Sequence, residues 1–151
     1  MATTTATRSG TPALLGNDEA RIDGHGKVSG QTKYTADFTR EGMLWSAFVA
    51  SPYAHARIVR IDTSAAKAMT GVRAVLTGAD LGERFFGCVL KDWPVLAYER
   101  VKFVGEYVVA VAADTRAIAE AAAAAVDVEY EELPAVLDAE AAIAADAPAF
   151  H

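Results

Sequence analysis

Hydrophobic and polar positions follow a regular pattern along the middle of the chain, and this pattern predicts strands. Residues 44–50 form an apolar run that predicts a buried strand, which has to end at Pro52 because proline has no N–H for a ladder. Residues 57–61 alternate between polar and apolar and predict a half-buried strand. Residues 72–76 predict a third strand, separated from the second by only a short connection.

Helices are predicted where a capping residue precedes an alanine-rich or amphipathic stretch. Asp62 has the side chain of an N-cap for a short helix over residues 63–69, and Gly71 suits the C′ position after it. Asp114 is the expected N-cap of a helix over residues 115–125, whose alanines favour helix and allow close packing on a sheet. A last helix is expected after Asp138.

Two further strands complete the pattern. Residues 101–113 give the strongest strand signal, and the apolar run from Tyr107 onward predicts a strand that is covered on both faces. Residues 126–131 alternate strictly, which predicts Val126, Val128 and Tyr130 inward and three acidic residues outward. One open strand face cannot surround a calcium ion with six or more oxygens, so the acidic residues are interpreted as a solvated face.

Residues 78–94 are the least regular part of the predicted domain. They contain Phe85, Phe86 and Trp93 in a loop-like context. Long loops within compact domains are often functional or interfacial, but these aromatic residues could equally form a small cluster beneath the loop. The predicted order of elements favours an α+β fold with a mixed sheet and short helices, over residues 21–151, preceded by a flexible tail over residues 1–20.

Composition narrows the function classes. The formal net charge of −6 and the lack of a basic stripe argue against nucleic-acid binding. Cys88 is the only cysteine, so neither an internal disulfide nor a cysteine-based cluster can form within the chain. With no apolar run of membrane-spanning length and no signal-peptide pattern, a cytoplasmic location is expected.

Candidate catalytic groups are few, and none is assigned. Gly24, Gly26 and Gly30 miss the dinucleotide-binding fingerprint by one residue, and neither a leading strand nor a following helix is predicted beside them, so they are interpreted as turn glycines. His25, His55 and His151 match no metal-binding spacing, and a thiolate–imidazole pair with Cys88 has no local support. The residues themselves therefore predict no catalytic, cofactor-binding or metal-binding residue.

A series of short motifs, in order along the chain, resembles the amino-terminal α/β hammerhead domain of molybdenum hydroxylase large subunits, the xanthine dehydrogenase and aldehyde oxidase superfamily. The most distinctive is Ser51-Pro52-Tyr53-Ala54-His55-Ala56-Arg57-Ile58. The other motifs are Arg21-x-Asp23-Gly24-x-x-Lys27-Val28-x-Gly30-x-x-x-Tyr34-x-x-Asp37, Asp62-Thr63-Ser64-x-Ala66, Gly71-Val72, Thr77-x-x-Asp80, Val101-x-Phe103-Val104-Gly105-Glu106 and Val128-x-Tyr130-x-x-Leu133-Pro134. The family usually has proline where Tyr107 stands, a change that concerns the backbone more than chemistry.

The resemblance implies a hammerhead fold and a setting in a larger enzyme. Family members hydroxylate aldehydes, purines, N-heterocycles or carbon monoxide-like small substrates, using a molybdenum–pterin cofactor, with [2Fe–2S] clusters and often FAD to carry electrons away. The resemblance places the cofactor loops and the catalytic glutamate in later domains, so none of their roles is transferred to residues of this chain. The implied partners are a molybdenum-cofactor-binding chain and an iron–sulfur subunit.

Three functional hypotheses follow. The chain is a domain or split piece of a molybdenum hydroxylase, or a stand-alone binding module of the same fold, or a fragment without a function of its own. Large exposed apolar patches would favour the first hypothesis over the second. For His55, two interpretations stay open: it shapes an interface with a partner, or its ring fixes the turn after Pro52 through backbone hydrogen bonds, and the second is favoured.

Overall fold

The computed structural model describes residues 21–82 and 84–148, and the chain divides into two compact units, Met1–Arg40 and Glu41–His151. The predicted tail over residues 1–20 lies outside the described residues. The domain bounds 21–151 stay a prediction.

The described part of the first unit is held by local contacts alone. It contains the helix α1 (Gly24–Val28) and the 3-10 turn η1 (Thr35–Asp37), and none of residues 21–40 is buried. Asp23 accepts ion pairs from Arg21 at 2.6 Å and from Lys27 at 2.5 Å. The prediction of a loop over the glycine-rich stretch was wrong at α1, because residues 24–28 close a helical turn of their own.

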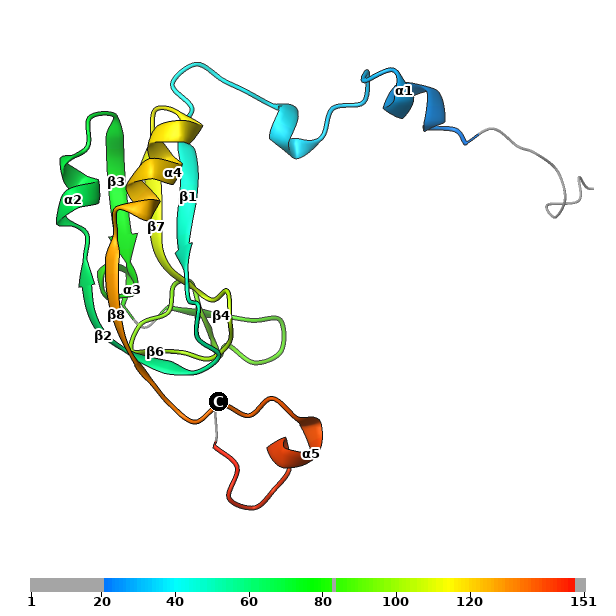
Figure 1. The fold of residues 1–151 in the computed structure, drawn as a ribbon. Coiled ribbons are helices and arrows are strands. Elements are labelled where there is room, and N and C mark those ends of the chain that lie inside the picture. The colour runs from blue at the N-terminus through cyan, green and yellow to red at the C-terminus, as the bar shows by residue number, and fades with distance from the viewer. Residues whose placement is uncertain (1–20, 83, 149–151) are drawn as a thin grey trace, which may run out of the picture. The chain divides into compact units, whose positions relative to one another are not determined.

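The second unit is built on two small antiparallel sheets (Figure 1), which confirms the α+β prediction. The predicted mixed sheet was wrong, because all the strand pairs in the described residues are antiparallel. The first sheet, in the order β1-β7-β3, consists of β1 (Trp45–Ala50), β7 (Tyr107–Ala113) and β3 (Val72–Thr77). The second, in the order β6-β2-β8, consists of β6 (Arg100–Val101), β2 (Ala56–Asp62) and β8 (Asp127–Glu132). The two-residue strands β4 (Phe85–Phe86) and β5 (Trp93–Pro94) pair antiparallel with each other.

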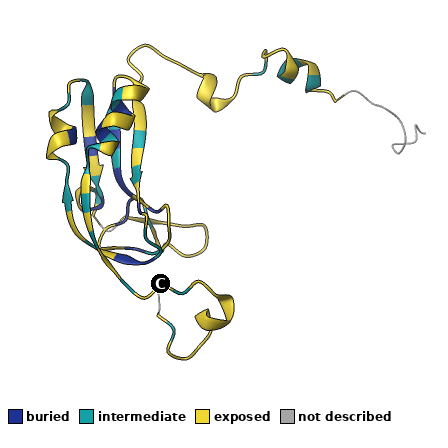
Figure 2. Ribbon diagram, viewed as in Figure 1, coloured by how far each residue is buried: buried dark blue, intermediate teal, exposed yellow. Residues whose placement is uncertain are grey.

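The core joins the first sheet and its helix α4 (Arg116–Ala124) to the second sheet, which contributes Ala56 of β2 and Val101 of β6. Val109, Val111 and Ala113 of β7 and Ala119 and Ala122 of α4 are all buried. Alanine on the helix allows it to approach the sheet closely, as the sequence predicted. In Figure 2 the buried segments follow β7 and α4 and the loop region below them, while most of the remaining ribbon is exposed or intermediate.

Three short helices complete the second unit. They are α2 (Ser64–Ala68), α3 (Gly78–Leu81) and α5 (Ala139–Ala142). The predicted helix after Asp138 is confirmed, since the Asp138 carboxylate accepts hydrogen bonds from the backbone N–H groups of Glu140 and Ala141. Helix α3 and the β4–β5 pair give residues 78–94 more regular structure than the sequence indicated.

Two predicted N-caps were wrong by one residue. Helix α4 begins after Thr115, whose hydroxyl accepts the N–H of Ile118, whereas Asp114 instead binds Arg73 through two hydrogen bonds of 2.7 and 2.8 Å. Helix α2 begins after Thr63, and the Asp62 carboxylate accepts the N–H of Ser64 at 2.9 Å. A cationic partner from a distant strand decides the role of an aspartate, and local sequence cannot show that partner.

The predicted strand over residues 101–113 was wrong in its first half. Residues 102–106 form a turn between β6 and β7, and Gly105 there has a φ of 91°, which only glycine adopts readily. The alternation in β8 was right: Val128 and Tyr130 pack against the core, and Asp127, Glu129 and Glu131 are exposed. The acidic residues pair with arginines of β2, since Glu131 binds Arg57 and Asp127 binds Arg60.

Candidate functional site

The motif beginning at Ser51 forms a turn that is bonded to the turn at residues 102–106. The N–H of Ser51 donates to the carbonyl of Glu106 at 2.9 Å, and the N–H of Gly105 donates to the carbonyl of Ser51 at 2.8 Å. The Ser51 hydroxyl also accepts the N–H of Tyr53 at 3.0 Å. Ser51 is buried, so these bonds satisfy backbone groups that water cannot reach.

His55 joins the same turn to the chain that leaves β8. Its Nδ1 lies 2.7 Å from the carbonyl oxygen of Pro134, and its own carbonyl accepts the N–H of Leu133 at 2.9 Å. The side chain is only 7% exposed. The ring thus bonds a backbone group, as the favoured interpretation held, but that group belongs to Pro134 and not to the turn after Pro52.

Glu106 is the third buried polar residue among those described, together with Ser51 and His55. Its Oε2 accepts the N–H of Lys102 at 2.6 Å, which closes the turn that carries Phe103 and Val104. A carboxylate that accepts backbone hydrogen bonds within a turn positions that turn. All three buried polar residues lie in the family motifs, but nothing in the local sequence indicates that Ser51 would anchor the backbone.

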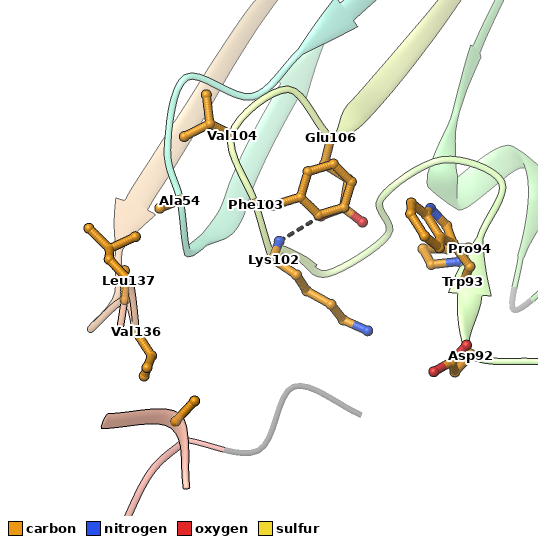
Figure 3. Close-up of a pocket in the computed structure, with 12 residues that line it drawn as sticks. Ala54, Asp92, Trp93, Pro94, Lys102, Phe103, Val104, Glu106, Val136 and Leu137 are labelled. Atoms are coloured by element: carbon orange, nitrogen blue, oxygen red, sulfur yellow. Dashed lines mark hydrogen bonds between the residues drawn. The ribbon is translucent and has the colours of Figure 1, made fainter. Parts of the chain in front are cut away.

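A pocket of about 610 Å³ lies beside this anchored turn (Figure 3). Four segments contribute to it: the turn after β1, the β5 region, the turn before β7 and the segment around α5. Most of the lining is apolar, with Asp92, Lys102 and Glu106 as the charged members. The lining residues are Ala54, Asp92, Trp93, Pro94, Lys102, Phe103, Val104, Glu106, Ala135, Val136, Leu137 and Ala142.

Aromatic side chains extend from the pocket across the surface. Trp93 meets Phe103 edge-on at 5.7 Å and lies 6.1 Å from Phe86, and Phe48 stacks on Tyr107 at 4.5 Å between ring centroids. An adjoining hollow of about 430 Å³ is lined by Phe86, Trp93, Phe103 and Tyr107, among others, and connects the two groups. We call Phe48, Phe86, Trp93, Phe103 and Tyr107 the aromatic patch. All five are more than 40% exposed.

The two interpretations of residues 85–93 are therefore partly reconciled. The rings do contact one another, as in a cluster beneath a loop, but about half the surface of Phe86 and Trp93 is exposed to solvent. A patch of stacked, half-exposed rings is suited to contact with another apolar surface.

The described residues do not assemble a donor set for the cofactors that the fold family uses. No three His, Cys, Asp or Glu side chains within residues 21–82 and 84–148 lie close enough to hold a metal ion. Iron–sulfur clusters need several thiolate or imidazole ligands, and the chain has one cysteine, the exposed Cys88. His25 is exposed on α1, and His151 lies outside the described residues.

The titratable groups with shifted pKa values have structural causes. Burial raises the pKa of the Tyr130 phenol, whose ring packs against Tyr53 at 5.3 Å. The hydrogen bond from Arg73 lowers the pKa of Asp114, and bonds from the backbone and hydroxyl of Thr77 lower that of Asp80. None of these groups lines the pocket of Figure 3. Within the described part of the chain, no helix is long and apolar enough to cross a membrane.

Comparison with known proteins matches residues 29–134 to the family model "Aldehyde oxidase and xanthine dehydrogenase, a/b hammerhead domain". The chain is 45% identical over 132 residues to a probable xanthine dehydrogenase subunit of Bacillus subtilis, a match that covers 87% of this chain and 18% of that protein. It is 34% identical over 142 residues to the xanthine dehydrogenase molybdenum-binding subunit of Escherichia coli O157:H7, covering 87% of this chain and 19% of that protein.

The fold is also similar to that of solved enzymes. Quinoline 2-oxidoreductase from Pseudomonas putida 86 superimposes with a TM-score of 0.75 at 43% identity, over 84% of this chain and 17% of the enzyme chain. The chain thus spans less than a fifth of the length of each of these relatives. It belongs to the aldehyde oxidase and xanthine dehydrogenase α/β hammerhead family, whose members among its relatives are molybdenum hydroxylase large subunits.

Proposed function

We propose that this chain acts as the hammerhead domain of a molybdenum hydroxylase, packing against the molybdenum-cofactor domains and contributing no reactive group. The observation that carries this proposal is the aromatic patch, with its pocket, on the surface of a domain that spans less than a fifth of each of the three relatives described above. The complete enzyme's reaction, an oxidative hydroxylation, belongs to the assembly.

The exposed apolar surface supports packing against a companion. Trp93 and Phe86 are each about half exposed, at 51% and 52%, and Leu137 on the far side of the pocket is 86% exposed. Contiguous apolar surface of this kind on a folded domain marks an interaction site. A stand-alone module would be expected to replace such residues with polar ones.

The chemistry of the pocket supports a structural role. Acid–base or nucleophilic catalysis needs a nucleophile or proton carrier aimed at the reacting atom. Here the Glu106 carboxylate accepts a backbone N–H, and the rest of the pocket is mainly apolar. In this proposal the molybdenum–pterin cofactor, the [2Fe–2S] clusters and any FAD belong to the other polypeptides or domains of a cytoplasmic complex.

Co-expression with the polypeptide that carries the remainder of the large subunit tests this function. We expect a stable complex in which molybdenum co-purifies with both polypeptides, while the 151-residue chain alone binds neither molybdenum nor flavin. The measurement is metal analysis of the complex and of the isolated chain after size-exclusion chromatography.

The variant Trp93→Ser, with Tyr34→Ser as the control, connects the test to the aromatic patch. Both residues are aromatic and more than half exposed, but Tyr34 belongs to the first unit. Loss of complex with Trp93→Ser alone supports the proposal. Turnover of a substrate by the isolated chain, or failure of the wild-type chain to associate with the remainder of the subunit, would contradict it.

A further inference from the structure

Away from the register shifts between Val49 and Ala50 and between Val72 and Ala74, the strand register assigns the side chains of the sheet β1-β7-β3 to two faces. On one face, Val49, Val109 and Thr77 form one cross-strand row, and Ala47, Val111 and Val75 form the next. Val109, Val111 and Val75 are buried on this face. Helix α4 contacts all three strands of this sheet, and its Ala119 and Ala122 are buried, so the helix covers this buried face.

The opposite face is also apolar. Its rows are Phe48, Ala110 and Leu76, followed by Ser46, Ala112 and Ala74. We call these six residues the open face. Ser46 is the only polar member, and no member is charged.

The six residues of the open face are all at least partly exposed, whereas Val108, on the same side of β7, is fully buried and bounds the face there. Phe48 is 45% and Leu76 is 42% exposed, and even the small Ala110 and Ala112 at the centre of the sheet are only partly covered. In Figure 1, α4 lies over this sheet on one side only. A sheet with one solvated face normally carries polar side chains on that face, as the arginines and acidic residues of the sheet containing β2 and β8 do.

We propose that the open face is the surface on which the remainder of the same large subunit packs, through an apolar and uncharged surface of its own. This inference rests on the proposed function and names the place of contact. The length of chain outside the structure supports this occupant, because the relatives place more than four-fifths of the subunit beyond the segment matched here.

The open face is continuous with the aromatic patch. Phe48 belongs to both, and its stacking on Tyr107 at 4.5 Å leads from the sheet into the hollow lined by Phe86 and Trp93. One surface therefore extends from β3 across the sheet to β5. The part of this surface on the sheet has no charged side chains. Burying that part against a partner would therefore carry no free-energy cost of desolvating an ion.

Charge substitution on β3 tests the assignment. Leu76→Lys and Ala74→Lys place an ammonium group on the open face, and Val59→Lys is the matched control, since Val59 is a strand residue with 47% exposure on the other sheet. Each 151-residue variant is titrated against the remainder of the large subunit. We expect Kd to rise about tenfold or more for the two β3 variants. The control should stay within about twofold of the wild type.

Thermal unfolding of each isolated variant shows whether it is folded. Leu76→Lys and Ala74→Lys should unfold close to the wild-type temperature, because both side chains already contact solvent. Binding by the wild type that neither β3 variant weakens overturns the open-face assignment alone. Absence of wild-type binding overturns it together with the proposed function. A third outcome is that the wild type forms dimers, that Leu76→Lys converts them to monomers, and that binding to the remainder of the subunit is unchanged. This outcome would overturn the open-face assignment, because the face would then belong to a contact with a second copy of the chain.

Discussion

His55 illustrates how a residue that suggests chemistry can serve the backbone instead. Its imidazole binds the carbonyl of Pro134, and its own carbonyl accepts the N–H of Leu133, so the residue holds the chain after β8 against the turn after β1. Removal of the imidazole would delete the hydrogen bond to Pro134 and leave a void where a buried residue packs.

We predict that His55→Ala lowers the free energy of unfolding by about 1–3 kcal/mol, the usual range for removing a buried, hydrogen-bonded side chain. The measurement is equilibrium urea unfolding of the 151-residue chain. His25→Ala is the control, since His25 is an exposed residue of the first unit, and its substitution should leave the unfolding midpoint unchanged. Equal stability of His55→Ala and the wild type would show that the Pro134 bond contributes nothing.

At the scale of elements, the junction between β7 and α4 depends on an ion pair with β3. The N–H of Asp114 donates to the carbonyl of Gly71 at 2.9 Å, and its carboxylate accepts both hydrogen bonds from Arg73. Gly71 precedes β3 with a φ of 89°, and a Cβ there would approach Ile118 of α4 to 2.8 Å. The connection before β3 and the start of α4 therefore fit together only with glycine at this position.

We predict that the Arg73–Asp114 pair makes stability depend on acidic pH. The hydrogen bond from Arg73 lowers the pKa of Asp114 from its ordinary value of 3.8 in the folded state. The unfolded chain then binds more protons in that range, so the pair's contribution is fully present above about pH 3.8 and is lost as the pH falls through the folded pKa. The wild type should therefore be more stable than Asp114→Asn at neutral pH, and the difference should shrink below that value.

Urea unfolding of both proteins across pH 3–7 measures this difference; the range is chosen to span roughly the titration of an aspartate. Asp146→Asn removes the same charge from the exposed C-terminal segment and should change stability little at any pH. A difference between the wild type and Asp114→Asn that is constant across the range would contradict the prediction.

At the scale of the whole chain, the two units differ in how their residues are held. None of residues 21–40 is buried, whereas the second unit contains the valine core of β7 and its helix. A protease needs an extended backbone that it can enter, and exposed segments without tertiary contacts provide it.

We predict that limited trypsin digestion cleaves first at Lys33 or Arg40 and leaves a fragment that begins close to residue 41. Arg57 and Arg60 are internal controls, because they are also exposed but lie in a strand bonded to β8. Mass spectrometry of early digestion products identifies the sites. Early cleavage at Arg57 or Arg60, ahead of Lys33 and Arg40, would contradict this picture of the second unit.

Much of the fold could be predicted because its signals are local. Hydrophobic periodicity predicted the strands β1, β2, β3, β7 and β8, and the helix propensity of alanine predicted α4. The capping positions could not be predicted to the residue, since Asp114 and Thr115 are both acceptable caps and a distant arginine decided between them. The turn at residues 102–106 was missed because its apolar residues have the pattern of a strand. Only the structure shows the positive φ of Gly105 and the hydrogen bond from the N–H of Lys102 to Glu106 that form the turn.

The sequence by itself determined the family, the α+β elements and the absence of a cysteine-based cluster, because motifs, periodicity and residue counts are properties of the chain alone. The prediction that β7 is covered on both faces holds at Val108, which is fully buried, but was wrong at Ala110 and Ala112, which are partly exposed. Only the tertiary structure decided that one face meets α4 while the other is open, and that Phe48, Trp93 and Tyr107 gather beside it. The physical reason is that an exposed surface depends on which segments pack together, and residues far apart in the sequence carry no local signal of that contact.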